Sequence, residues 1–323
     1  MEKLTIFDKL YQCFEKFLTL CPSFGHFYIK CFGLKFPYRN KLYLSQYIKA
    51  KENNDDITSL PKAEGMLRKI QLANLKIMKE LDSVCKSQNI EYWVVYGTQL
   101  GAIRHKGYIP WDDDIDISMM RDDYEKLSKI FNEVTTDKDL YMETMYNKHL
   151  PGMFTPKIKH KKLPFLFIDI FPWDYYHSKL TPEQREEVSK KITEHRNKIT
   201  KDKSLLKLGF DECYNYIKSY TKENILDNKT PDPSTEPDIF IPLDYPHDSR
   251  MRIFSYNDIL PAIDSSFENT TLKQAKSPET LAEGHFGKNY MDYPPEIALG
   301  HCRNVIITPK EQKLLDEYIK TEL

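Results

Sequence analysis

Acidic residues follow closely behind a glycine–threonine pair in the first half of the chain. The run Gly97–Asp116 reads GTQLGAIRHKGYIPWDDDID. In an extended strand Asp114 and Asp116 share one face, with Cα atoms about 7 Å apart, and Asp112 joins them if the strand reaches back that far. Carboxylates at this spacing repel one another strongly unless a cation lies between them. The expected cation is Mg²⁺, held by one or two carboxylates and by substrate phosphates, with Mn²⁺ as the alternative.

The elements around this run are expected to bring a phosphate beside the carboxylates. Ile90–Tyr96 is rich in β-branched and aromatic residues and predicts a strand, which the pair Gly97-Thr98 allows to turn. Gln99–Arg104 predicts a short helix, so the amides of the turn lie at its positive end, where phosphate binds well. The threonine hydroxyl adds a donor, and Arg104 either binds phosphate in a bidentate fork or is only a helix-end charge. Tyr108–Met119 is expected to return as a second strand.

Neither feature is specific by itself. A glycine–threonine turn is usually only a turn, and an acidic run is usually a solvated loop. Here they occur on adjacent predicted strands, about 15 residues apart. This joint occurrence favours a metal-dependent enzyme that acts on a nucleotide-linked phosphate.

The stretch Tyr96–Tyr124, YGTQLGAIRHKGYIPWDDDIDISMMRDDY, resembles the signature of the LicD family, bacterial relatives of fukutin and the fukutin-related protein. The resemblance implies an α/β (α+β) fold with a nucleotidyltransferase-like core, a mixed β-sheet flanked by helices. It also implies transfer of a phosphorylated alcohol from a CDP-activated donor to a hydroxyl of a glycan. Gly97 and Thr98 match the phosphate-binding turn, and Asp114 and Asp116 match the metal-binding pair.

In folds of this kind a third carboxylate comes from a later strand. The best match is Asp169 within Phe165–Asp174, FLFIDIFPWD, which resembles the family's D-I-F-P segment. Asp169 also stands out as a charge inside a run of strand formers, where burial costs several kcal/mol unless the carboxylate is paired or binds metal. An exposed position at the end of the strand is the alternative. Asp174, just past Pro172, is expected to be a turn or cap residue.

The resemblance extends to both sides of this core. Met66–Cys85 has the apolar spacing of an amphipathic helix, and its expected role is packing. Leu281–Pro295, followed by His301, resembles the family's C-terminal segment, although Phe286 replaces the usual tyrosine.

The expected mechanism is metal-assisted phosphoryl transfer with CMP as the leaving group. Asp112 and Asp169 are both candidates for the base that takes the acceptor's proton, ahead of His105, whose context also fits an exposed turn. Lys157 and Lys159 lie on one face of a predicted strand, where they either neutralise donor phosphates or protect an exposed sheet edge.

Several readings of the function stay open. Phosphocholine is the family's most familiar cargo, but ribitol phosphate and glycerol phosphate fit the same core. A quaternary ammonium would favour an aromatic cage, and the aromatic residues beside the motifs could supply one or belong to the core: Tyr108, Trp111, Trp173, Tyr175 and Tyr176. A nucleotidyltransferase, a D-x-D glycosyltransferase and a non-catalytic glycan-binding protein are the other classes considered.

Composition narrows the partners. The chain has 323 residues and a net charge of −1, which argues against a dedicated nucleic-acid binder and leaves a CDP-alcohol donor and a glycan or glycolipid acceptor. The six cysteines show no C-x-x-C pair, so we expect reduced thiols in a cytoplasmic protein. No secretory signal and no membrane-spanning helix are expected.

The chain is expected to contain a helical N-terminal segment and one catalytic domain. The segment covers residues 1–60, and the nucleotidyltransferase-like domain covers 61–323 with an insertion at about 178–250. Residues 1–50 hold 8 Lys or Arg, 3 acids and 12 aromatic residues. This content suits peripheral contact with the inner face of a membrane, but packing of the aromatic side chains onto the core is the favoured explanation.

Overall fold

The computed structural model describes residues 41–147, 149–244, 249–297, 301, 305 and 307–321. Most of the predicted N-terminal segment, residues 1–40, therefore lies outside the described residues. Among the described helices, none is long and apolar enough to cross a membrane.

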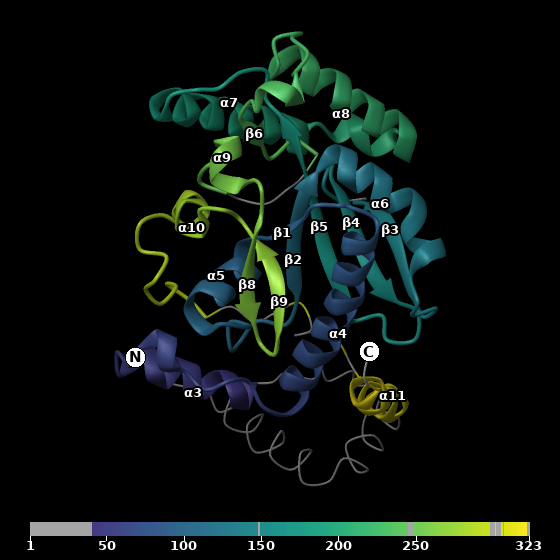
Figure 1. The fold of residues 1–323 in the computed structure, drawn as a ribbon, viewed down its shortest axis with the longest axis vertical. Helices are drawn as coiled ribbons and strands as arrows, with labels where there is room; N and C mark the ends of the chain where they lie inside the picture. The colour runs from purple at the N-terminus through teal and green to yellow at the C-terminus, as the bar shows by residue number, and fades with distance from the viewer. Residues whose placement is uncertain are drawn as a thin grey trace.

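A mixed sheet of nine described strands forms the centre of the molecule (Figure 1). Its main path runs β3-β4-β5-β2-β1-β9-β8, and β6 and β7 extend it beyond β5. β2 is parallel to β5 and β1 is parallel to β9, whereas the other pairs are antiparallel. The sheet and its flanking helices confirm the predicted α/β class. The strands are β1 (Trp93–Val94), β2 (Ile115–Met120), β3 (Leu140–Tyr146), β4 (Phe154–His160), β5 (Phe167–Tyr175), β6 (Ile239–Phe240), β7 (Ile253–Phe254), β8 (Ile263–Phe267) and β9 (Thr270–Gln274).

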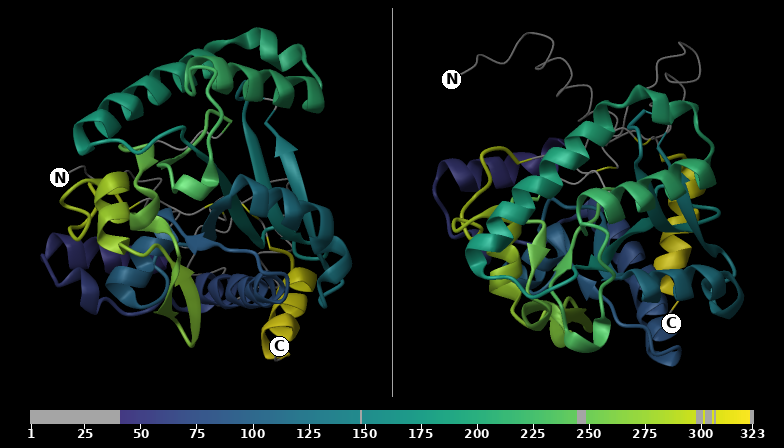
Figure 2. Two further views of the ribbon diagram at one scale, coloured as in Figure 1. Left: turned by 45° about the horizontal axis from the view of Figure 1, so that its top comes forward. Right: turned by 90° about the horizontal axis from the view of Figure 1, so that it is seen from above.

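Helices cover the sheet and extend one end of it. α4, α6 and α11 pack on one face over the largest hydrophobic cluster (Figure 1). α7 and α8 run together across one end, where they share a second cluster with β4 and β6 (Figure 2). The helices are α3 (Lys41–Glu52), α4 (Gly65–Ser87), α5 (Tyr96–His105), α6 (Arg121–Val134), α7 (Pro182–Lys201), α8 (Phe210–Asn224), α9 (Tyr256–Ile259), α10 (Pro278–Phe286) and α11 (Pro309–Lys320), with 3-10 turns η1 (Ile57–Ser59), η2 (Lys203–Lys207) and η3 (Pro233–Thr235).

Local sequence signals explain several of these elements. The apolar residues of α4 face the core as the predicted amphipathic helix requires. α7 and α11 each begin at a threonine capping box, in which Thr181 pairs with Gln184 and Thr308 with Glu311. Such caps satisfy amides that a helix start leaves without intrahelical partners.

Two predicted strands are shorter than expected. The strand predicted at Ile90–Tyr96 is limited to β1, because Tyr96 takes a left-handed backbone with φ of 50° and already begins α5. The strand predicted at Tyr108–Met119 begins only at Ile115. Residues 108–114 are irregular because their backbone groups bind side chains from elsewhere, as the Tyr108 amide binds Glu268.

The described part of the N-terminal segment packs against the core. Tyr47 on α3 is fully buried, its ring centroid lies 5.6 Å from that of Trp111, and its hydroxyl donates to the Pro61 carbonyl. A small hydrophobic cluster joins Tyr47 to Leu100 of α5 and to Ile109. For this part of the segment the favoured packing explanation is supported; the question of membrane contact falls mainly on residues 1–40.

We predict that removing residues 1–52 lowers the melting temperature much more than removing residues 1–40, because only the longer deletion takes away Tyr47. The substitution Tyr47→Ala should reproduce most of this loss, at about 3–5 kcal/mol of unfolding free energy. Thermal denaturation checks both expectations. Sedimentation with anionic vesicles, compared between the full chain and the shorter deletion, tests the remaining membrane hypothesis, and equal stability of the two deletions would contradict the packing explanation.

Candidate active site

Three carboxylates from two neighbouring strands meet on one face of the sheet. β2 and β5 run parallel, with Asp116 opposite Asp169, and Asp114 comes immediately before β2. One carboxylate oxygen from each of the three lies within 4.8 Å of the others. We call Asp114, Asp116 and Asp169 the acidic cluster. Its carboxylate oxygens suit a hard divalent cation. The predicted identity of that cation, Mg²⁺, stays a prediction.

A lysine on the neighbouring strand β4 lies beside the acidic cluster, in line with Asp116 and Asp169 across the sheet. Lys157 on β4 pairs with Asp169 across the ladder, and its ammonium lies 2.5 Å from the Asp169 carboxylate and 3.8 Å from the centre of the Phe167 ring. Lys159 instead forms an ion pair of 2.9 Å with Glu143 on β3. Lys157 is therefore at the acidic cluster. The charge of Lys159 is matched by Glu143. Its predicted contact with donor phosphates stays a prediction.

Burial and mutual repulsion act on the carboxylates of this site. Burial is the largest cause that raises the pKa of Asp116 and of Asp169, and nearby carboxylates raise both further. Lys157 opposes the rise at Asp169. Asp112 lies beside the cluster, where burial and then Asp114 raise its pKa well above the usual range. Each of these shifts shows that negative charge is unfavourable here unless a positive group joins it.

The first turn of α5 lies against these carboxylates. A Cβ atom at Gly97 would come within 2.5 Å of Asp112 Oδ2, so a larger residue here would displace the Asp112 carboxylate. The Thr98 hydroxyl accepts a hydrogen bond of 2.8 Å from the Asp116 amide. Gly97 and Thr98 belong to the helix itself and not to a separate turn, but they lie at its positive end as expected. Their phosphate contact stays a prediction.

Arg104 and His105 close the same helix. Arg104 is 6% exposed, and its Nη1 donates to the carbonyls of Tyr290 and Asp292 at 3.1 and 3.2 Å. Burial lowers the pKa of Arg104 to about 10 and that of His105 to about 4. In this structure Arg104 holds the C-terminal segment that resembles the family, which sequence reasoning did not anticipate. Its predicted phosphate contact stays untested.

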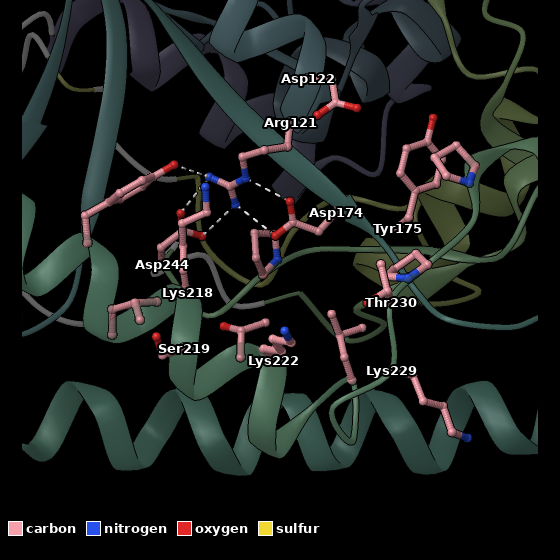
Figure 3. Close-up of a pocket in the computed structure, with 17 residues that line it drawn as sticks. Arg121, Asp122, Asp174, Tyr175, Lys218, Ser219, Lys222, Lys229, Thr230 and Asp244 are labelled. Atoms are coloured by element: carbon pink, nitrogen blue, oxygen red, sulfur yellow. Dashed lines mark hydrogen bonds and ion pairs between the residues drawn. The ribbon is translucent and has the colours of Figure 1, made fainter.

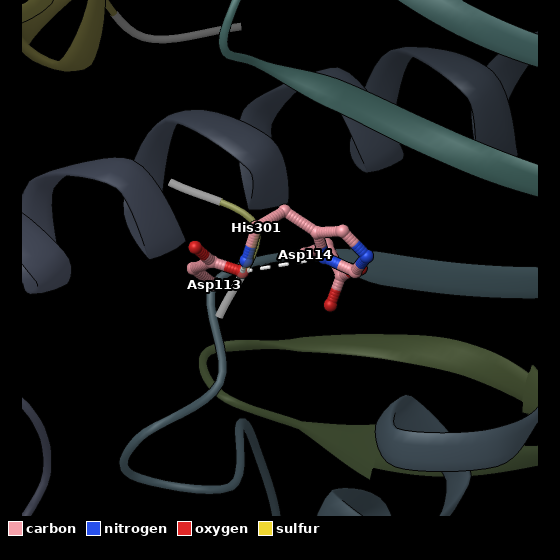
Figure 4. Close-up of side chains that lie close together, drawn as sticks. All are labelled: Asp113, Asp114 and His301. Atoms are coloured by element: carbon pink, nitrogen blue, oxygen red, sulfur yellow. Dashed lines mark hydrogen bonds and ion pairs between the residues drawn. The ribbon is translucent and has the colours of Figure 1, made fainter. Parts of the chain in front are cut away.

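His301 reaches the acidic cluster from the C-terminal part of the chain. Its Nδ1 lies 2.8 Å from Asp114 Oδ2 and 3.7 Å from Asp113 Oδ1 (Figure 4). Its backbone N–H donates to Asp113 Oδ1 at 2.9 Å. The interactions of the imidazole itself with the Asp113 and Asp114 carboxylates raise the pKa of His301 to about 11. The sequence offered one signal for this residue, its place after the C-terminal segment, but no role.

Two buried amides on α4 hold the backbone that carries the carboxylates. Asn74 donates to the Asp113 carbonyl at 2.8 Å and accepts from the Phe167 amide at 3.1 Å, so it joins the starts of β2 and β5. Gln71 donates to the Asp112 carbonyl at 2.8 Å. Both side chains are fully buried. The helix that was expected only to pack therefore also positions the acidic cluster.

A second group of charged residues, centred on Arg121, lies at the C-terminal ends of β2 and β5, away from the acidic cluster. Arg121 forms ion pairs of 2.8 Å with Asp174 and 2.9 Å with Asp244, beside a pocket of about 470 Å³ that α8 also lines (Figure 3). The expectation that Asp174 is a turn or cap residue was wrong. It lies within β5, where it pairs with Phe240 of β6. Asp174 lies five positions beyond Asp169 along β5, or about 16 Å, so this pocket is remote from the acidic cluster.

Most aromatic residues beside the motifs belong to the core. Tyr108, Trp111, Trp173 and Tyr176 are buried, and Tyr175 stacks on Tyr256 with ring centroids 6.4 Å apart.

A mixed α/β sheet that presents carboxylates from adjacent strands beside a helix start is typical of the nucleotidyltransferase class. Residues 89–209, which include the whole acidic cluster, match the family model described as LicD/FKTN/FKRP, nucleotidyltransferase domain. The chain therefore carries a LicD-family domain over residues 89–209, as its signature suggested.

Two relatives illustrate the extent of the similarity. The chain is 32% identical over 158 residues to the lipopolysaccharide cholinephosphotransferase LicD of Haemophilus influenzae, over 46% of this chain and 54% of that protein. It is 44% identical over 107 residues to an uncharacterised protein of Rickettsia prowazekii, over 32% of this chain and 40% of that protein. The chain thus spans about half of the length of these relatives, or less.

We predict that Asn74→Leu weakens Mg²⁺ binding about 10–100-fold, the usual cost of removing a group that orients metal ligands. The substitution leaves a carbonyl and an amide without their buried partner, at about 1–3 kcal/mol each, so stability falls as well. The matched control is Asn132→Leu, because Asn132 of α6 makes the same two contacts with the backbone of Met142 on the distant strand β3. Calorimetric Mg²⁺ titration should separate the two variants, and equal metal affinity in both would contradict the positioning role.

Proposed function

We propose that the protein is a metal-dependent phosphotransferase that moves a phosphorylated alcohol, with phosphocholine as the first candidate, from a CDP-linked donor to a hydroxyl of a cell-surface glycan or its precursor. The observation that carries this proposal is the acidic cluster at the start of α5 within a LicD-family domain. The similarity to the lipopolysaccharide cholinephosphotransferase of Haemophilus influenzae supports choline as the alcohol and a lipopolysaccharide as the kind of acceptor. Transfer of ribitol phosphate or glycerol phosphate is the alternative within the same chemistry.

The residues of the site have distinct tasks in this proposal. Asp114, Asp116 and Asp169 would hold Mg²⁺, which when bound would neutralise charge on the phosphates. The amides at the start of α5 and Lys157 bind phosphate oxygens of the donor. The acceptor oxygen then forms a bond to the phosphorus of the alcohol phosphate, the bond from that phosphorus to the bridging oxygen breaks, and CMP leaves with the bridging oxygen.

A carboxylate must take the proton of the acceptor hydroxyl. Asp112 suits this task because burial and its acidic neighbours raise its pKa, and a carboxylate with a raised pKa accepts a proton more readily near neutral pH. Asp169 is the second candidate, although its ion pair with Lys157 favours the charged form. His105 is less suited, since burial lowers its pKa to about 4.

The direct test supplies CDP-choline, CDP-ribitol and CDP-glycerol in turn, with a lipopolysaccharide preparation as acceptor and with Mg²⁺ or a chelator. The proposal expects CMP and a phosphodiester product that depend on the metal. Release of pyrophosphate would indicate a nucleotidyltransferase, and a glycosidic product would indicate a glycosyltransferase. Glycan binding that needs neither donor nor Mg²⁺ would indicate a binding protein.

We predict that Asp114→Asn and Asp116→Asn each abolish CMP release. Without metal, Asp116→Asn should unfold at the same or a higher temperature than wild type at neutral pH. The folded-state pKa of Asp116 is raised, so its charged form destabilises the fold as pH rises through that pKa, and the amide removes this cost. Asp114→Asn loses the ion pair with His301 and should gain less. Activity above a few per cent of wild type in either variant, with Mg²⁺ present, would contradict the metal assignment.

We predict that Asp169→Ala weakens Mg²⁺-dependent donor binding and turnover together. Asp174→Ala is the matched control on the same strand, since it removes a carboxylate whose partner is Arg121 and not the acidic cluster. It should lower stability and leave the affinity for Mg²⁺ unchanged. Donor binding measured with and without Mg²⁺, together with thermal denaturation, distinguishes the two, and the reverse pattern would show that the third ligand is a different carboxylate.

A further inference from the structure

We propose a second cation site, formed by Asp113, Asp114 and His301, for a divalent transition-metal ion such as Mn²⁺ or Zn²⁺. One potential ligand atom from each of these residues lies within 4.8 Å of the other two. Asp114 belongs to this group and to the acidic cluster, so its carboxylate would bridge the two sites. The inference rests on the proposed metal-dependent function only through this shared residue.

The distances between the ligand atoms suit a coordinated ion. Metal–ligand bonds of about 2.1 Å place neighbouring ligand atoms about 3.0–3.4 Å apart in tetrahedral or octahedral geometry. His301 Nδ1 lies 2.8 Å from Asp114 Oδ2 and 3.7 Å from Asp113 Oδ1, values on either side of that range. Shifts of a few tenths of an ångström would bring both pairs into it.

His301 is held by its contacts with the Phe167 ring and with the Asp113 carboxylate. Its ring packs edge-on against Phe167, with centroids 5.6 Å apart. The backbone N–H of His301 is fixed by Asp113 Oδ1. Asp113 is in turn held by Asn74, which donates to its carbonyl. The two carboxylates are 3% and 4% exposed, for Asp113 and Asp114 respectively, so they face His301 from a largely buried position.

The ligand set selects a different ion from that of the acidic cluster. Mg²⁺ strongly prefers oxygen, whereas imidazole with carboxylates suits Mn²⁺, Zn²⁺ and Co²⁺. In two-metal enzymes, two metal ions about 3.5–4 Å apart act together on phosphates. A shared Asp114 provides such a bridge, with an all-oxygen site on one side and a nitrogen-containing site on the other.

The experiment counts bound Mn²⁺ in the full chain after treatment with a chelator and detects nitrogen ligation by electron spin-echo spectroscopy. Wild type should bind two ions, and its spectrum should show coupling to an imidazole nitrogen. His301→Gln should bind one ion without that coupling. His301→Asp, which replaces nitrogen by a carboxylate, should keep two ions but lose the coupling, and this result separates ligation from any loss of folding.

His149→Gln is the matched control, because His149 is an exposed histidine on the connection between β3 and β4. It should behave as wild type. A single ion with only oxygen ligands in wild type, or nitrogen coupling that survives in His301→Gln, would overturn the second site. The proposed function would then still stand or fall on Mg²⁺-dependent CMP release, which is measured without Mn²⁺ and does not depend on the nitrogen signal.

Discussion

The repulsion among carboxylates placed side by side on β2 and β5 is the constraint on which the rest of the site depends. Parallel pairing puts Asp116 directly opposite Asp169, and strand alternation brings Asp114 to the same face. The sheet cannot relieve this repulsion by moving the side chains apart, because the register is fixed by the hydrogen bonds of two buried strands. Positive groups must therefore come to the carboxylates.

Segments distant in sequence supply those groups and hold them in place. Lys157 on β4 forms an ion pair with Asp169, and His301, from the C-terminal part of the chain, forms one with Asp114. α4 fixes the backbone beneath through Asn74. Arg104 ties the segment before His301 to α5. The protein thus balances the charge with internal cations that an incoming metal ion would have to displace or join.

The sequence predicted the parts of this arrangement that depend on local pattern. Alternation along a strand predicted that Asp114 and Asp116 share a face, and the isolated charge at position 169 indicated a special environment. The early start of α5 at Tyr96 could not be predicted, because a left-handed conformation at a tyrosine requires the packing that buries its ring. The contacts of Arg104 could not be read from the sequence either, since its partners lie more than 180 residues away. Such contacts follow from the tertiary fold and not from neighbouring residues.

The two ends of β2 and β5 solve the same electrostatic problem in different ways. At the far end, Asp174 and Asp244 share Arg121, whose guanidinium has enough donors to satisfy two carboxylates at once. At the near end, Asp116 has a raised pKa and no described lysine or arginine within ion-pair distance. A fold that paired all of its buried carboxylates as it pairs Asp174 would have no reason to bind a cation. The difference between the two ends is therefore the physical argument for assigning metal chemistry to the acidic cluster and a structural role to Arg121.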